Sequence, residues 1–357
     1  MIKNESKLII AILFIYGTLL SLTTIPVLAR IVEKFDIYNP PTSRDLHKGK
    51  IPKLMGLVFY FGIILASVYL FKFQKDDQML YLITALSIIL YIGVRDDIYN
   101  MSPWGKIILQ GVAIMIILIP KDLVLNDLYG FLGINEINDF VAYPFTLFIG
   151  IFMINSFNLI DGIDGLAGIM SIFMLTCFGL LFYLLNDLFL VYLVAILIGT
   201  SAGYLRFNLS ENRKVFMGDT GSLILGFFMF FFLLQLINHN YLNDIDFLVQ
   251  NEMSIWFGLL IFLHPILDSG SIFISRLKKG KSPFSPDKGH IHHLLLNRFE
   301  SHRNVSLIVL GYSLSGVVIN VGVVYFFPHS YNYVIPAYIF ISFIFIYVLR
   351  KSNRGVN

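Results

Sequence analysis

Long apolar stretches separated by short polar connections dominate the chain. Runs of about 17 to 25 mostly apolar residues are long enough to span a bilayer as helices. Because the polar connections 120–140 and 239–253 are brief, we expect a single all-α, polytopic membrane domain over 1–357, with a cytoplasmic basic and histidine-rich loop at 276–304. Eleven such runs are predicted, near 7–29, 54–71, 79–94, 105–120, 141–159, 166–185, 188–205, 221–238, 254–275, 305–327 and 333–349.

The composition agrees with a membrane protein. The chain is 57% hydrophobic and 14% charged, whereas soluble domains carry about 25% charged residues. The single Cys177 lies inside an apolar run and excludes a disulfide framework. The first run starts near Leu8 and has no small-residue cleavage site before Arg30, which favours a retained helix over a signal peptide.

The basic residues predict the orientation of these helices. Cytoplasmic loops are enriched in Lys and Arg, and the eleven runs place 21 of the 26 Lys and Arg residues on one side, against Lys3, Lys7, Lys72, Lys75 and Lys121 on the other. We therefore expect the amino terminus outside and the carboxyl terminus in the cytoplasm.

This orientation places six aspartates in or beside apolar segments at the cytoplasmic face. Ionisable residues in such positions are costly and point to a functional site. Asp96 and Asp97 are adjacent at the end of the third run, so a metal ion or a basic cluster is needed for both to ionise. The alternative is a solvated interfacial pair that caps the loop. The six are Asp96, Asp97, Asp161, Asp164, Asp219 and Asp268.

The segment NSFNLIDGIDGLAG (155–168) carries a denser pattern. Gly162 and Gly165 allow the backbone to approach a ligand closely. The alternative is a glycine-rich helix-packing surface with polar interhelical bonds. Four polar residues recur at every third position and approach one face of a helix or turn, namely Asn155, Asn158, Asp161 and Asp164.

The segment VFMGDTGS (215–222) places Asp219 in a glycine-flanked turn before the eighth run. A helix amino terminus there presents free N–H groups to phosphate, while Asp219 is available to a hard cation. Asp-Thr-Gly is also the triplet of soluble aspartic proteases, but those enzymes need β-rich lobes and a second copy. Intramembrane aspartyl proteases need Gly-x-Gly-Asp, and position 216 is Phe.

The loop after the ninth run combines lysines, among them Lys288, with His290, His292 and His293. A structural zinc site needs four ligands at closed spacing, whereas Lys, Arg and imidazole donors suit a diphosphate and its leaving group. The lysines are equally explained by the positive-inside bias. In the ninth run, His264 and Asp268 share a helix face, and Pro265 is expected to bend the helix. We expect Asp268 to line the site.

These motifs in combination resemble the polyprenyl-phosphate N-acetylhexosamine-1-phosphate transferases. The resemblance covers about 44–298 and rests on DDIYN followed by Lys106 and Gln110, NSFNLIDGIDGLAG, FN before FMGDTGS, and HIHH after SPF. The HIHH form resembles the UDP-HexNAc branch, closest to UDP-GlcNAc:undecaprenyl-phosphate GlcNAc-1-phosphate transferases. It differs from the triple-histidine form of the phospho-MurNAc-pentapeptide transferases of peptidoglycan synthesis, which remain the alternative.

The resemblance implies that undecaprenyl phosphate attacks a UDP-HexNAc at the cytoplasmic face of the bacterial inner membrane and releases UMP, with Mg²⁺, or Mn²⁺ in its place, as cofactor. The product starts a lipid-linked glycan such as O-antigen, teichoic acid or capsule. Membrane lipids and a homodimer are further expected partners, and nucleic acid is not.

The resemblance also implies residue roles. Asp219, Asn158 and Asp97 are the expected metal ligands, while Asp96, Asp97 and Asp161 are expected in the chemistry together with His290, His292 and His293. The expected substrate-binding residues are Lys48, Lys106, Asn155, Asn158, Gly162, Asp164, Asn208, Phe216, Asp268 and Lys288. Met55-Gly56 replaces the usual glycine pair, and Ser156 replaces a common alanine.

Two other classes fit less well. A transporter predicts charges near mid-membrane and repeated halves, but the charges crowd one face here. A CDP-alcohol phosphatidyltransferase continues its Asp-Gly with Ala-Arg, whereas Leu166-Ala167-Gly168 follows here.

Overall fold

The computed structural model describes residues 4–37, 51–72, 77–120, 122–238, 251–278, 280, 289–299, 301–327 and 330–353. This part of the chain is built from helices, apart from turns and an isolated bridge between Asp127 and Glu136. In chain order they are α1 (Asn4–Lys34), α2 (Leu57–Leu70), α3 (Gln78–Tyr99), α4 (Pro103–Ile117), η1 (Phe131–Gly133), α5 (Asp139–Leu159), α6 (Leu166–Leu184), α7 (Leu188–Asn208), α8 (Gly218–Ile237), α9 (Asn251–Ile261), α10 (Leu263–Lys278), α11 (Ile291–Phe299), α12 (His302–Phe326) and α13 (Tyr331–Asn353).

The predicted all-α membrane fold is confirmed. Every predicted apolar run coincides with helix, and eight of the described helices are long and apolar enough to cross a membrane, or nine if the bent pair α9 and α10 counts as one span. At 14 and 15 residues, α2 and α4 are shorter. A rise of 1.5 Å per residue makes them about 21 and 23 Å long, against a hydrocarbon core of about 30 Å. The count of eleven spans and their orientation therefore stay predictions.

The predicted run 254–275 is bent, as expected from Pro265. The axes of α9 and α10 differ by 74° at a break beside Phe262. Phe262 N donates to Gly258 O, and Ile266 N donates to Phe262 O. Between these bonds, Pro265 has no N–H for the Ile261 carbonyl, which explains the position of the break.

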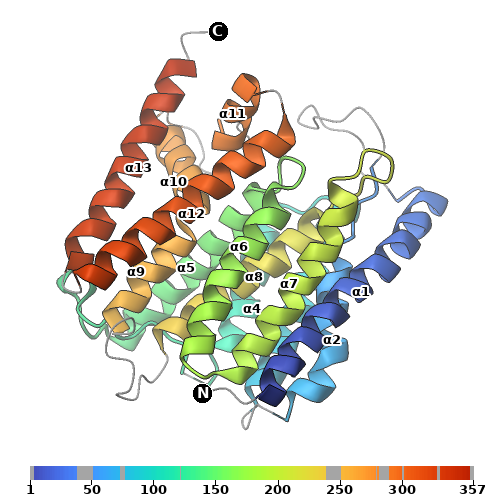
Figure 1. Ribbon diagram of the computed structural model, residues 1–357, viewed down its shortest axis with the longest axis horizontal. Helices are drawn as coiled ribbons and strands as arrows, with labels where there is room; N and C mark the ends of the chain where they lie inside the picture. Colours follow the sequence, from blue (N-terminus) through green and yellow to red (C-terminus); the bar gives the residue numbers. More distant parts are fainter. Residues whose placement is uncertain are drawn as a thin grey trace.

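Helix α8 forms the centre of the bundle. It packs against α2, α3, α5, α6 and α9, and its phenylalanines are fully buried. Helices α1 and α2 lie on one flank against α7, whereas α12 and α13 lie on the opposite flank (Figure 1). A polar group at the first turn of α8 is therefore enclosed by protein on several sides.

The first turn of α8 lies very close to two other segments. A Cβ atom on Gly93 of α3 would overlap the backbone of Thr220, and one on Gly56 would overlap the backbone of Gly221. Small residues at such positions allow backbones to approach within a membrane bundle. These two glycines therefore bring α3 and the start of α2 to the amino terminus of α8.

Polar caps and loops gather at one end of the bundle. Here α3, α5 and α7 end, and α4, α6, α8 and α12 begin, as hydrogen bonds between their termini require. Ser102 caps α4, where Pro103 stands at the first position, and Ser301 caps α12. The loop 276–304 is not wholly irregular, because it contains the short helix α11 at this same end (Figure 1).

Candidate active site

A lysine bridges two carboxylates at this end of the bundle. The Lys106 ammonium of α4 lies 2.6 Å from Asp96 Oδ2 and 2.5 Å from Asp219 Oδ2. Asp96 belongs to the last turn of α3, and Asp219 to the first turn of α8. Met101 N donates to Asp96 Oδ1 at 2.5 Å. All three side chains are between 14% and 24% exposed, so the cluster is enclosed yet open to a ligand.

Asp97 faces a different direction and holds the amino terminus of α8. Its Oδ1 accepts from Asp219 N at 3.0 Å, while its Oδ2 accepts from Thr220 N at 2.9 Å and Thr220 Oγ1 at 2.6 Å. The free N–H groups and positive dipole end of a helix favour a carboxylate there. Gly218 has φ +70°, and a Cβ atom on it would overlap the Asp97 carboxylate. Both Asp97 oxygens are thus committed to α8.

The side-chain amides of Asn155 and Asn158 connect α5 to α4 and to α8, respectively. Asn155 Nδ2 donates to Gln110 Oε1 at 2.7 Å, and the Gln110 amide donates back to Asn155 Oδ1 at 3.4 Å. Asn158 Oδ1 accepts from Ser222 Oγ at 2.7 Å, and Asn158 Nδ2 lies 3.5 Å from Asp219 Oδ2. Asn158 therefore lies beside Asp219, whereas Asn155 contacts α4.

The turn between α5 and α6, which we call the aspartate turn, carries Asp161 and Asp164. Burial raises the pKa of Asp161 well above its usual range, and the negative charges of Asp219 and Asp97 add to this shift. Asp164 Oδ2 lies 2.7 Å from Lys214 Nζ and 3.0 Å from His302 Nδ1. Burial acts to raise the pKa of Asp164, but the hydrogen bonds from His302 and Lys214 outweigh it and lower that pKa to about 2.

The loop between α7 and α8 is held from both sides. Asn208 Oδ1 accepts from Gly165 N at 2.7 Å, and Asn208 Nδ2 donates to Val215 O at 2.9 Å. Phe216 N donates to Pro52 O at 2.9 Å, which brings the start of the α2 segment alongside. Asn208, an expected substrate-binding residue, therefore holds the backbone at both Gly165 and Val215. Phe216, another expected substrate-binding residue, is half-buried.

The predicted site residue Asp268 is enclosed among histidines. Its Oδ2 lies 3.0 Å from His290 Nδ1, and its Oδ1 accepts from Ile291 N at 2.7 Å. Arg350 Nη2 of α13 lies 3.6 Å from Asp268 Oδ1. Asp268 thus fixes the amino terminus of α11 and the orientation of the His290 ring.

His292 connects this histidine cluster to the aspartate turn. A Cβ atom on Gly162 would lie 2.5 Å from His292 Nε2, so Gly162 leaves room for that imidazole. The His292 and His293 ring centroids are 4.4 Å apart. Burial lowers the pKa of His292 to about 3, despite the opposing charge of Asp268. His292 is therefore neutral at pH 7.

Whether a divalent cation fits this site depends on which side chains can coordinate it. Asp96 and Asp219 already converge on one cation, the Lys106 ammonium. No group of three acidic, histidine or cysteine side chains among the described residues forms a ready-made metal cage. Mg²⁺ usually takes one or two carboxylates and completes its shell with water and substrate phosphates. Two converging carboxylates fit this pattern.

Most of the predicted site residues within the described part of the chain lie at one end of the bundle, but in separate clusters with different contacts. The predicted residues Lys48 and Lys288 lie outside the described residues. Sequence reasoning missed Lys214, His302 and Thr220, which contact Asp164 or Asp97. Thr220 follows Asp219 directly, but the other two lie outside the recognisable motifs, so only the folded chain reveals them.

Known proteins resemble this chain over most of its length. The family model "Glycosyl transferase family 4" matches residues 79–237. The undecaprenyl-phosphate alpha-N-acetylglucosaminyl 1-phosphate transferase of Yersinia pestis is 30% identical over 312 residues, 85% of this chain and 82% of the relative. The protein of the same name from Salmonella typhi is 30% identical over 361 residues, and the match covers 97% of this chain and 93% of that relative. A probable undecaprenyl-phosphate N-acetylglucosaminyl 1-phosphate transferase of Bacillus subtilis (strain 168) is 29% identical over 88% of this chain and 86% of its own.

The helical bundle, the acidic cluster at one end and these relatives define the class, which is the polytopic membrane transferases. Within this class, the chain belongs to glycosyl transferase family 4.

Proposed function

We propose that this protein transfers N-acetylglucosamine 1-phosphate from UDP-GlcNAc to undecaprenyl phosphate. The observation that carries the proposal is the Asp96–Lys106–Asp219 cluster at one end of a membrane bundle, in a chain whose relatives carry the names reported above. The basic residues support a cytoplasmic position for this end. The protein then works in the bacterial inner membrane and starts a lipid-linked envelope glycan.

The reaction exchanges one phosphoanhydride bond for another. An oxygen of the lipid phosphate attacks the β-phosphorus of the UDP-sugar, the bond from that phosphorus to the bridging oxygen breaks, and UMP leaves with the bridging oxygen. A phosphate monoester has a second pKa of about 6, so the nucleophile is largely ionised at pH 7. The protein therefore needs to position and neutralise charge more than to remove a proton.

Lys106 is placed to neutralise a phosphate, because its ammonium is partly exposed between two carboxylates. Asp96 removes any residual proton from the lipid phosphate. Asp219 and Asp96 would hold Mg²⁺, with Asn158 beside Asp219. When bound, the ion supplies charge neutralisation at the diphosphate and at the departing UMP.

The histidines act on the UDP-sugar donor. His290 and His292 are held near the aspartate turn by Asp268 and by the contact with Gly162. Because His292 is neutral, it can donate or accept a hydrogen bond without adding charge. We assign to this cluster the orientation of the diphosphate and its leaving group.

The test is release of UMP by purified full-length protein with undecaprenyl phosphate and a panel of UDP-sugars, with and without Mg²⁺. We expect UMP from UDP-GlcNAc only with the lipid and the metal. Asp219→Asn abolishes release or shifts the Mg²⁺ requirement upward. Asp139→Asn is the matched control, because Asp139 is exposed at the opposite end of α5. The proposal fails if folded protein releases no UMP from any UDP-HexNAc.

A further inference from the structure

Helix α13 faces the rest of the protein along one stripe of side chains. Its buried residues recur at spacings of four, seven and four, which places them on one face of the helix, namely Tyr331, Ile335, Ser342 and Ile346. Other faces of α13 carry exposed apolar side chains such as Tyr347, which suits contact with lipid. Arg350 comes four residues after Ile346, so it continues the stripe that faces the protein.

Arg350 meets a carboxylate that is fully buried. Its Nη2 atom lies 3.6 Å from Asp268 Oδ1 and donates to the Asp268 carbonyl oxygen at 3.4 Å. An ionised carboxylate in such a position needs a partner of opposite charge. His292 Nδ1 is 3.7 Å from Asp268 Oδ2, but this imidazole is neutral at pH 7. A guanidinium stays protonated at any physiological pH, so Arg350 supplies Asp268 with a permanent positive charge.

The enrichment of basic residues in cytoplasmic segments does not explain the position of Arg350. That bias requires only that Lys or Arg lies at this end of the bundle, and the same segment of the chain also contains Lys351 and Arg354. A guanidinium on any face of α13 would meet the requirement equally well. Arg350 instead lies on the protein-facing stripe, where its side chain is only 13% exposed and reaches α10.

The carboxylate that Arg350 contacts also holds the start of α11. Asp268 Oδ1 accepts from Ile291 N at 2.7 Å, and Asp268 Oδ2 lies 3.0 Å from His290 Nδ1. One turn before Arg350, Ile346 belongs to the same small apolar cluster as Ile291. Helix α13 runs alongside α10 and also contacts α11 (Figure 1). The last turns of α13 therefore hold α11 against α10.

A separate contact anchors the other end of α13. Asn332 Oδ1 accepts from Trp256 Nε1 of α9 at 2.9 Å, and Trp256 and Ile335 share a second apolar cluster. Asn332 stands eighteen residues before Arg350, about 27 Å along a helix that rises 1.5 Å per residue. The two anchors can therefore be altered independently, and only the one at Arg350 reaches the histidines.

We propose that Arg350 is a positioning residue for the UDP-sugar donor. It acts through Asp268, because the guanidinium neutralises this buried carboxylate, and the carboxylate in turn holds the start of α11 and the His290 ring. Arg350 lies well outside residues 79–237, which the family model matches. The proposal rests on the proposed function, since it takes the histidine cluster to act on a UDP-sugar.

Kinetics of purified full-length variants test the proposal. Arg350→Met removes the charge and keeps an apolar stem, and we expect it to lower kcat/KM for UDP-GlcNAc about tenfold, since small displacements of positioned groups have large effects. The KM for undecaprenyl phosphate stays unchanged. Arg350→Lys keeps the charge without the guanidinium fork, so it should lose less, and it also carries the test if Arg350→Met does not fold.

Two controls separate positioning from general damage. Asn332→Ala removes the contact with α9, so it should lower the melting temperature and leave kcat/KM for UDP-GlcNAc unchanged. Arg303→Met removes an exposed positive charge at the start of α12 and should change neither quantity. In an Asp268→Asn background, Arg350→Met should cause little further loss of activity, because the carboxylate through which Arg350 acts is already neutral.

Amide hydrogen exchange gives a readout that needs no turnover. Exchange within 289–299 should become faster in Arg350→Met, but not in Asn332→Ala or Arg303→Met. The proposal is overturned if folded Arg350 variants keep the wild-type kcat/KM for UDP-GlcNAc, if Asn332→Ala lowers it equally, or if exchange within 289–299 is unchanged. Wild-type protein that releases no UMP from any UDP-HexNAc contradicts the proposed function instead, and the exchange data then still decide whether Arg350 holds α11.

Discussion

Asp97 and Thr220 are joined twice, through the backbone N–H of Thr220 at 2.9 Å and through its hydroxyl at 2.6 Å, both to the same carboxylate oxygen. This relationship sets the position of α8 against α3. Because Asp219 precedes Thr220, it also sets where the Asp219 carboxylate meets Lys106. Asp97 therefore acts on the acidic cluster through the backbone of α8.

We predict that Asp97→Ala lowers both stability and activity. The variant leaves buried N–H groups at the start of α8 without their acceptor, and a hydrogen bond to a charged group contributes about 1.5 to 3 kcal/mol. Thermal unfolding in detergent and UMP release measure the two effects.

Thr220→Val serves as the graded comparison, because it removes only the hydroxyl bond. We expect its losses to lie between those of the wild type and Asp97→Ala, with a weakened affinity for Mn²⁺ in both variants because Asp219 is displaced. An Asp97→Ala protein with normal melting temperature and normal Mn²⁺ affinity contradicts the positioning role.

A second prediction concerns the cation at the acidic cluster. The Lys106 ammonium occupies the space where Asp96 and Asp219 converge, so it competes with a divalent ion in the absence of substrate. Lys106→Met should bind Mn²⁺ more tightly, by about tenfold or more, which is the scale on which a neighbouring charge alters a carboxylate's affinity for a proton. Turnover should fall at the same time, because the phosphate loses its counter-charge.

Electron paramagnetic resonance of free Mn²⁺ or calorimetry measures this affinity without substrate. Lys214→Met is the matched control, because Lys214 pairs with Asp164 instead. Unchanged or weaker Mn²⁺ binding by Lys106→Met would show that the two carboxylates do not form the cation site.

The contact between Gly162 and His292 yields a third prediction. A methyl group on Gly162 would lie 2.5 Å from His292 Nε2, so Gly162→Ala pushes the imidazole and α11 away from the aspartate turn. We expect UMP release to fall by about tenfold or more, since a small displacement of positioned groups has large effects on rate. The melting temperature should change little, because Gly162 is exposed.

A double-mutant cycle with His292→Ala distinguishes contact from general damage. If the two residues act through their contact, Gly162→Ala should cost little activity in a His292→Ala background. Additive losses in the double variant would contradict this account.

The fourth prediction is a pH dependence of stability. The hydrogen bonds from His302 and Lys214 outweigh burial and lower the pKa of Asp164 to about 2, from an ordinary value of 3.8. A lowered carboxyl pKa contributes stability that is fully present above about pH 4 and is lost as the pH falls through about 2. For this shift the contribution is about 2 kcal/mol.

Asp164→Asn should therefore be less stable than the wild type at pH 7, and the difference should shrink as the pH falls below about 4. Melting temperatures of both proteins between pH 7 and pH 3 measure it. Asp139→Asn, which alters an exposed aspartate, should show no such convergence. A stability difference that is constant across this pH range would contradict this account. It would mean that the Asp164 charge does not link the α5–α6 turn to Lys214 and His302.

Much of the architecture was predictable from local pattern. Apolar runs of membrane length must form helices, because the bilayer offers no other partner for the backbone N–H and C=O groups. Each predicted run accordingly coincides with helix. The combination of DDIYN, NSFNLIDGIDGLAG, FMGDTGS and HIHH was also enough to indicate the family. The bend near Pro265 was expected, but not its 74° angle, which depends on the packing around α9 and α10.

Only the tertiary structure decided which neighbours Asp96 and Asp97 each contact. Consecutive residues on a helix point about 100° apart, so one of the two faces the Lys106 cluster and the other faces α8. The sequence shows only that both are carboxylates at the end of one apolar run. Which neighbour each one meets depends on α4 and α8, which come from distant parts of the chain.

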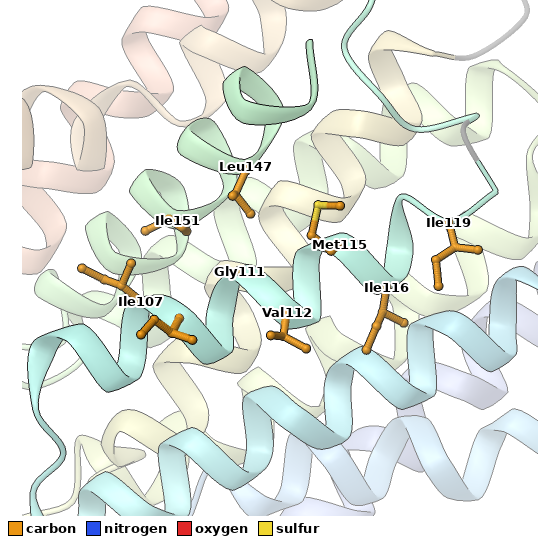
Figure 2. A pocket seen from close by; sticks show the side chains of 9 residues that line it. Ile107, Gly111, Val112, Met115, Ile116, Ile119, Leu147 and Ile151 are labelled. Carbon is orange, nitrogen blue, oxygen red and sulfur yellow. The ribbon is translucent and has the colours of Figure 1, made fainter. Parts of the chain in front are cut away.

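The same difference between local sequence and tertiary contacts applies to the rest of the protein. The amino-acid sequence by itself determined the helices, the polar residues at their ends and the family, because these follow from hydrophobicity and from short motifs. Only the tertiary structure decided that Lys214 and His302 pair with Asp164 and that His292 lies against Gly162. It also decided that Ile107 of α4 and Leu147 of α5 line one apolar groove (Figure 2). Each of these is a contact between segments far apart in the chain, and such contacts are set by packing rather than by local composition.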